Sequence, residues 1–126
     1  MWRLNHWNVN AMQSAPIRFT AIAGLLLAPT PAAAMPHVYT DLILGVSSLE
    51  SCIEDAERVG RKHGFTDDIE VVEHGATLRD FYADHKNLPV SFTVSCSTRL
   101  GGAAYAVAGM NNEITFKIFR KIYDDF

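Results

Sequence analysis

The sequence has no apolar run long enough to cross a membrane as a helix. Its most apolar stretch, Phe19–Ala28, has ten residues, whereas a transmembrane helix needs about 20. Pro29 and Pro31 would break a helix that extended the stretch. Arg18 precedes it and three alanines, 32–34, follow it. A basic residue, a short apolar core and small residues before a cleavage point are typical of a secretory signal peptide rather than of a membrane anchor.

We expect cleavage after Ala34, because this cut places small residues at both recognition positions. Residues 1–34 would then be the signal peptide, and Met12 is an alternative start that gives a signal of ordinary length. Residues 35–126 would form a single domain in the periplasm or outside the cell. The alternative is an unprocessed amphipathic leader.

Basic residues are scarce in this expected domain. It contains nine Lys and Arg residues against all fourteen Asp and Glu residues, a formal net charge of −5. This balance argues against a nucleic-acid partner, which requires clustered basic residues, and it disfavours adhesion to anionic lipid. We therefore expect the partner to be a protein or a small ligand, with no stable membrane anchor after cleavage.

Motifs of catalysis and cofactor binding are also missing. No Cys-x-x-Cys pair exists for redox chemistry. The run GVSSL, 45–49, is not a Gly-x-Ser-x-Gly nucleophile motif, and RLGGAA, 99–104, lacks the Lys-Ser/Thr end of a phosphate loop. The sequence therefore favours a non-catalytic binding domain without a cofactor.

Two cysteines, Cys52 and Cys96, are present, and an even number in a small exported domain is typical of a disulfide. The alternative is two unpaired thiols in the core. Cys52 lies in the run 47–64, which begins with Ser47 and Glu50 at capping-box spacing and ends with Gly64 as a helix cap. Apolar residues recur in it at helical intervals: Leu49, Cys52, Ile53, Ala56, Val59 and Gly60. The pattern predicts a helix with Cys52 on its buried face.

Cys96 lies in the run 89–98, where apolar and hydroxyl side chains alternate. Val90, Phe92, Val94 and Cys96 share one face, which predicts a strand with Cys96 pointing into the core. A helix packed on this face would bring the two thiols into one layer. Closing a loop of 44 residues would stabilise the domain by about 4 kcal/mol in the chain-entropy model.

The remaining runs predict an α+β domain with the element order β-α-β-β-β-α. We expect strands over 38–46, over 68–74 and over 102–110, the last forming a hairpin with the cysteine strand through a glycine turn. The run 111–126 begins with asparagine caps and predicts a helix, although Ile114, Phe116 and Ile118 also fit a strand. The fold would be a mainly antiparallel sheet with two helices on one face. We expect the small alanine face of 102–110 to let a helix approach closely.

The arrangement resembles that of small secreted bacterial proteins of unknown function. In these proteins a helix near the mature start carries one cysteine and a central strand carries the other, followed by an alanine-rich strand and a last helix. The corresponding segments here are SLESCIEDA, SFTVSCST, AYAVAGM and EITFKIFRKIYDDF, so that the resemblance covers most of residues 38–126. It is structural and implies no chemistry, so no catalytic residue is carried over from it.

The connection 75–89 is the longest in the expected domain and the best candidate for a binding surface. It would hold a short helix capped by Thr77, or a further strand. The candidate residues are Leu78, Phe81, Tyr82, Asp84, His85 and Lys86. The structural alternative is that Phe81 and Tyr82 only fill the edge of the core.

A rival hypothesis is a metal-binding or small hydrolytic protein that uses His74, His85 and Asp84, with His37 as a further ligand. The histidines lack the spacing of a known metal motif, and exposed surface histidines explain them more simply. A square-planar copper site at an N-terminal Met35-Pro36-His37 is excluded, because Pro36 has no amide hydrogen to lose; looser ligation through the Met35 sulfur and the His37 ring remains open. We interpret His63 as a cation at a helix C-terminus.

Overall fold

The computed structural model describes residues 35–126, which form a five-stranded antiparallel sheet and two helices. The elements in chain order are β1 (His37–Leu44), α1 (Leu49–Lys62), β2 (Phe65–Glu73), β3 (Leu78–His85), β4 (Val90–Ser97), β5 (Gly102–Gly109) and α2 (Asn112–Tyr123). The expected signal peptide and its cleavage point before residue 35 lie outside the described residues. Among residues 35–126, neither helix is long and apolar enough to cross a membrane.

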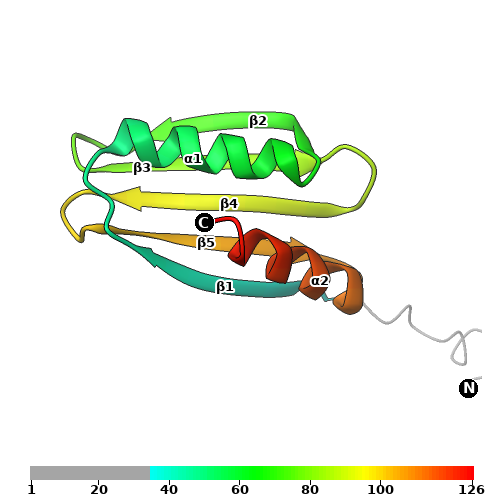
Figure 1. Cartoon of the computed structure of the whole chain (residues 1–126). Helices are drawn as coiled ribbons and strands as arrows, with labels where there is room; N and C mark the ends of the chain where they lie inside the picture. Colours follow the sequence, from blue (N-terminus) through cyan, green and yellow to red (C-terminus); the bar gives the residue numbers. More distant parts are fainter. Residues whose placement is uncertain (1–34) are drawn as a thin grey trace, which may run out of the picture. The chain divides into compact units, whose positions relative to one another are not determined.

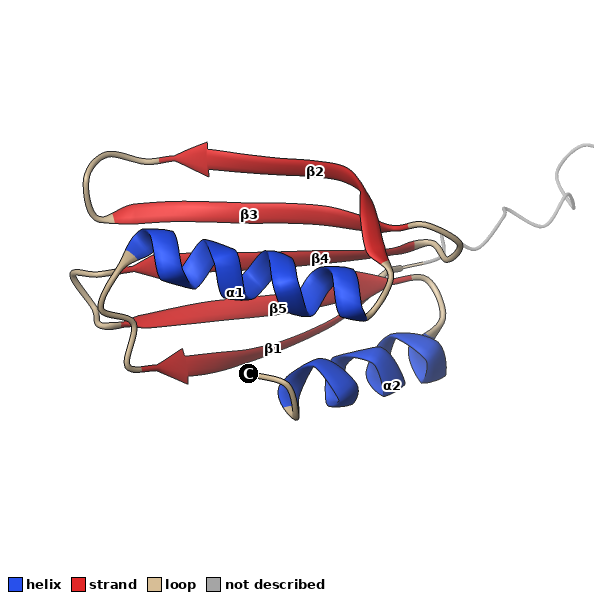
Figure 2. Cartoon of the chain, turned by 45° about the horizontal axis from the view of Figure 1, so that its top comes forward, coloured by secondary structure: helices blue, strands red, loops and turns tan. Residues whose placement is uncertain are grey.

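The strand order is β1-β5-β4-β3-β2, so β1 and β2 are the two edges of the sheet. Figure 1 shows α1 and α2 on the same side of the sheet, with α1 packed on β3 and β4 and α2 packed on β5 and β1. Figure 2 gives the same two layers from a second direction. The predicted α+β class, with two helices on one face of an antiparallel sheet, is confirmed.

One strand was missing from the expected order, because the connection 75–89 contains β3. This strand lies between β2 and β4 and pairs with both. Its side chains alternate between buried and accessible, with Phe81 and Ala83 in the core and Tyr82 outside it. The short-helix alternative is therefore wrong and the further-strand alternative is correct. A strand in this position gives its backbone groups ladder partners on both sides, which an isolated short helix would not gain.

Helix α1 follows the predicted pattern, except that it begins one residue later. Ser48 rather than Ser47 is the N-cap, and its hydroxyl oxygen accepts a hydrogen bond from the Ser51 amide at 3.3 Å. Gly64 follows the helix with φ +87°, a conformation that favours glycine. The predicted apolar stripe of α1 faces the sheet.

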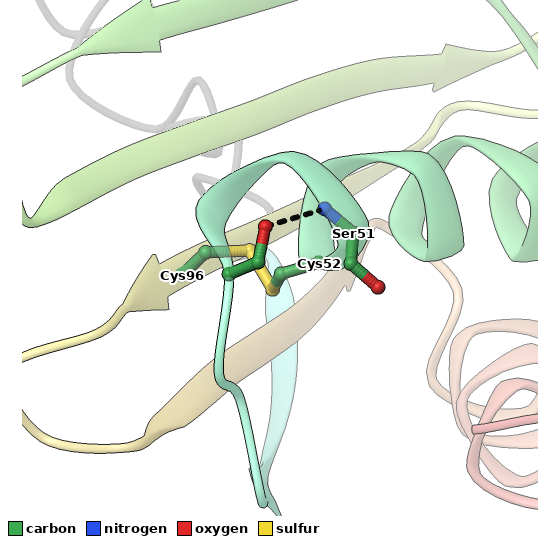
Figure 3. The surroundings of a disulfide bond; sticks show 4 residues. Ser51, Cys52 and Cys96 are labelled. Atoms are coloured by element: carbon green, nitrogen blue, oxygen red, sulfur yellow. Dashed lines mark hydrogen bonds between the residues drawn. A yellow bond between two sulfur atoms is a disulfide. The ribbon is translucent and has the colours of Figure 1, made fainter.

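The expected disulfide joins α1 to the central strand β4 (Figure 3). Cys52 lies in the first turns of α1, Cys96 near the end of β4, and their Cα atoms are 6.1 Å apart. Both cysteines are buried. The bridge therefore links the helix layer to the sheet inside the core.

The alanine face of β5 was expected to let a helix approach closely. This expectation is wrong, because neither helix packs on that face. They pack on the opposite face of the sheet, where glycines provide the close contacts. A Cβ on Gly109 would lie 2.5 Å from the Thr115 hydroxyl of α2, and one on Gly60 of α1 would lie 3.3 Å from the Phe92 ring. The alternation of β5 directs Tyr105 to the helices and Ala104, Ala106 and Ala108 away from them.

Candidate functional site

The sheet face opposite the helices has a centre of small side chains. Every second residue of β4 and of β5 points to this face, and the two sets lie side by side in register. Hydroxyl residues of β4 lie beside alanine and glycine residues of β5: Ser91, Thr93, Ser95 and Ser97 beside Ala108, Ala106, Ala104 and Gly102. Both described helices pack on the other face. We call this surface the open face.

At the end of the open face nearest the β4–β5 turn, the small residues form the floor of a hollow of about 300 Å³. Four leucines border this leucine hollow: Leu42 and Leu44 of β1, Leu78 of β3 and Leu100 of the turn. The register explains the shape, because Leu42 pairs with Ala104 and Leu44 with Gly102, so that large side chains stand beside small ones. The side chains of Leu42, Leu44 and Leu100 are 69%, 84% and 77% exposed, which leaves a contiguous apolar surface in solvent.

The candidate residues of 75–89 divide between the two faces of β3. Leu78 and Tyr82 lie on the open face, and Leu78 borders the leucine hollow. Phe81 is fully buried under α1. The alternative that Phe81 and Tyr82 only fill the edge of the core therefore holds for Phe81 but not for Tyr82. His85 is on the helix side, with its ring edge-on to Phe65 at 5.4 Å between centroids. Lys86 is exposed beyond the end of β3.

Asp84 and His85 both border a second hollow, which is polar and has a volume of about 440 Å³. Asp67 and Asp68 of β2 contribute two further carboxyl groups to its wall. The Ser91 hydroxyl donates a hydrogen bond of 2.6 Å to the Asp84 carboxylate. This hollow therefore gathers acidic groups, yet among residues 35–126 no group of three or more His, Cys, Asp or Glu side chains has the geometry to hold a metal ion.

The three histidines of the rival hypothesis are far apart. His74 follows β2 beside the start of β3, whereas His85 ends β3. The eight residues of β3 separate them by roughly 23 Å at the usual rise of a strand. His37 begins β1, which β5 and β4 separate from β3. The structure thus does not bring His37, His74 and His85 to one site.

His74 instead has Asp80 as its partner, which is not among the candidate residues predicted from the sequence. Its Nε2 lies 2.9 Å from Asp80 Oδ2, and the Tyr82 hydroxyl donates to the same oxygen at 3.2 Å. The charge of Asp80 is the main cause that raises the pKa of Tyr82. Asp80 Oδ1 is buried without a hydrogen-bond partner among the described residues. Asp80 pairs with Ser95, which lines the leucine hollow, but Asp80 itself does not line it.

His63 has a structural partner at the C-terminus of the chain. Its Nε2 lies 2.5 Å from one oxygen of Asp125, and the Lys62 ammonium donates to the other oxygen at 2.6 Å. The hydrogen bonds from Lys62 and His63 lower the pKa of Asp125. These contacts join the residues after α2 to the C-terminal end of α1.

Little in the local sequence indicates the leucine hollow. The alternation of Val38, Thr40, Leu42 and Leu44 predicts a strand. It does not show whether these side chains lie on the helix face or on the open face of the sheet. Comparison of the chain with protein-family models, with curated proteins and with solved structures found no match.

Proposed function

We propose that this chain is a non-catalytic binding domain of an exported protein, and that the leucine hollow takes the apolar part of a small, uncharged or cationic ligand. The observation that carries this proposal is the exposed apolar hollow on the open face. Its volume of about 300 Å³ is at the lower end of the range for small-molecule sites.

The surroundings of the hollow favour the chemistry of such a ligand. Ser95 and Ser97 provide hydroxyl groups in the lining of the hollow. The net charge of −5 over residues 35–126 disfavours anions. A small amphiphile with a hydrogen-bond donor at one end fits these features.

Export is supported by two observations of different kinds. The pattern before residue 35 is typical of a signal peptide. The buried disulfide Cys52–Cys96 belongs to a class of bond that persists in oxidising compartments. The rival metal or hydrolytic function lacks comparable support, since His74 and His85 lie at opposite ends of β3.

The test is titration with N-phenyl-1-naphthylamine, an uncharged dye whose fluorescence rises in apolar surroundings. We expect saturable binding at one site. Ala104→Leu, in the floor of the hollow, should weaken binding by at least about tenfold, equivalent to 1.4 kcal/mol. Ala108→Leu is the matched control, because Ala108 lies on the same strand and the same face but outside the hollow.

Circular dichroism of both variants shows whether each remains folded. Binding that is non-saturable in the wild type, or equally affected by the two substitutions in folded proteins, would refute a ligand site in the leucine hollow.

A further inference from the structure

The two edges of the sheet are built differently. Along β2 the register with β3 shifts twice, and Asp68 has a φ of +48°. The same strand carries four acidic residues: Asp67, Asp68, Glu70 and Glu73. Bulges and charges of this kind prevent an edge strand from pairing with another chain. By contrast, β1 pairs with β5 over all eight of its residues without a shift and contains one carboxylate, Asp41.

Among residues 35–126, no strand pairs with the outer edge of β1, so its outward-facing backbone groups have no partner in the sheet. Beyond β1 the ladder continues with the Gly45 amide, which donates to the Gly101 carbonyl at 2.9 Å. Since alternate residues of an antiparallel strand face the partner, the odd-numbered residues of β1 face β5 and the even-numbered ones face outward. The Leu42 amide agrees with this assignment, because it donates to the Asp41 carboxylate at 2.7 Å and not to β5.

Apolar side chains flank this edge on both faces of the sheet. On the open face, Val38 is 56% exposed and stands in line with the still more exposed Leu42 and Leu44. On the helix face, Tyr39 contacts Phe116 of α2, with ring centroids 5.1 Å apart. Phe116 and Tyr123 are about half exposed and, seven residues apart, lie on one stripe of the helix.

We propose that two copies of this chain associate through β1, whose outer edges pair antiparallel about a two-fold axis at Thr40 and join the two sheets into one. This inference goes beyond ligand binding, because it concerns the backbone edge of β1 and a macromolecular partner; of the residues in the proposed pairs, Leu42 also borders the leucine hollow. The interface is isologous: each copy contributes the same strand and the same flanking side chains.

The register about Thr40 makes β1 complementary to itself. Val38 then stands opposite Leu42 of the second copy on the open face, and Tyr39 stands opposite Asp41 on the helix face. A register centred on Asp41 would instead oppose two carboxylates, which is destabilising. The even-numbered residues Val38, Thr40 and Leu42 form the hydrogen-bonded pairs.

Charge favours a second copy at β1 over pairing at β2. Residues 35–126 carry a net charge of −5, and the acidic β2 is at the far edge of each sheet from β1. Joining two copies at β1 therefore keeps the acidic edges as far apart as the sheet allows. One local contact opposes association, because the Leu42 amide must leave the Asp41 carboxylate before it can pair.

The experiment is sedimentation velocity of the protein expressed from the full chain, over the micromolar range of concentration. We expect a dimer that dissociates on dilution. Thr40→Pro removes only an outward-facing amide and should raise the dissociation constant by at least about tenfold. Thr40→Val keeps the amide and should leave it unchanged. Asp41→Ala frees the Leu42 amide and should strengthen association.

If Thr40→Pro does not fold, disulfide cross-linking between two copies provides a second test. Paired residues of this kind have Cα atoms about 5.5 Å apart, within the range of a disulfide. Oxidised Thr40→Cys should therefore form a cross-linked dimer, whereas Thr66→Cys on β2 should not.

Three results would overturn the proposal: a wild type that stays monomeric throughout, folded Thr40→Pro and Thr40→Val proteins with equal dimer populations, or cross-linking of Thr66→Cys instead of Thr40→Cys. Dye binding distinguishes a failure of the dimer proposal from a failure of the proposed ligand binding. Thr40 does not border the leucine hollow, so Thr40→Pro should bind the dye as the wild type does.

Discussion

At the scale of single residues, Tyr105 shows the cost of a polar group in the core. Its ring packs against Phe119 of α2 at 5.4 Å between centroids, and only 2% of the residue is exposed. The hydroxyl oxygen is buried without a hydrogen-bond partner among the described residues. Burial is the main cause that raises the pKa of Tyr105 to about 12.

We predict that Tyr105→Phe increases the free energy of unfolding at neutral pH by about 1 kcal/mol, because an unsatisfied buried hydroxyl group is removed. The wild type should also lose stability as the pH rises from about 10, where an unfolded tyrosine ionises, towards the folded pKa of about 12. A raised folded pKa means that ionisation favours the unfolded chain. The phenylalanine variant should lose less over this range.

Urea unfolding of both proteins at neutral and alkaline pH measures these differences. A variant that is less stable than the wild type at neutral pH, with the same alkaline loss, would indicate that the hydroxyl group has a stabilising partner.

At the scale of elements, the contact between α2 and the sheet depends on Gly109. A Cβ there would lie 2.5 Å from Thr115 Oγ1, 3.0 Å from Val90 Cγ2 and 3.2 Å from the Pro89 carbonyl oxygen. Thr115 has little room to move, because it is fully buried and its hydroxyl donates to the Asn111 carbonyl at 2.6 Å. The end of β5 and the first turn of α2 are thus in direct contact.

We predict that Gly109→Ala lowers the free energy of unfolding by about 1–3 kcal/mol, the usual cost of overpacking. Thr115→Ala removes one of the colliding groups. A double-mutant cycle should therefore show that the two substitutions together cost less than the sum of the single ones. Additive effects would show that the contacts with Val90 and Pro89, rather than the contact with Thr115, exclude a side chain at this position.

The elements differ in how far the sequence could predict them. Both helices and the β4–β5 hairpin have local signals, such as the Asn111 cap, whose side chain accepts from the Ile114 amide at 3.0 Å. Strand β3 mixes charged, aromatic and small residues, so its alternation is weak, and pairing with two neighbours decided its structure. The leucine hollow depends on the pairing of Leu42 with Ala104, a long-range register that no local pattern encodes.

At the scale of the whole molecule, one small core must stabilise two layers. Both helices pack on one face of a single sheet, and the open face contributes little buried apolar surface. Domains of this size have a small margin of stability. A covalent link between the layers therefore has a large effect, and Cys52–Cys96 is such a link, closing a loop of 44 residues between α1 and β4.

We predict that loss of this disulfide lowers the free energy of unfolding by about 4 kcal/mol. Urea unfolding with and without a reducing agent gives the measurement, and a Cys52→Ala/Cys96→Ala double variant is the control whose stability the reducing agent should not change. If the leucine hollow binds the dye, the reduced protein should also lose dye binding at lower urea than the oxidised one, because the lining of the hollow includes Ser95 and Ser97, which flank Cys96. Equal stability of the oxidised and reduced proteins would mean that packing alone joins the two layers, and it would remove the structural argument for an oxidising compartment.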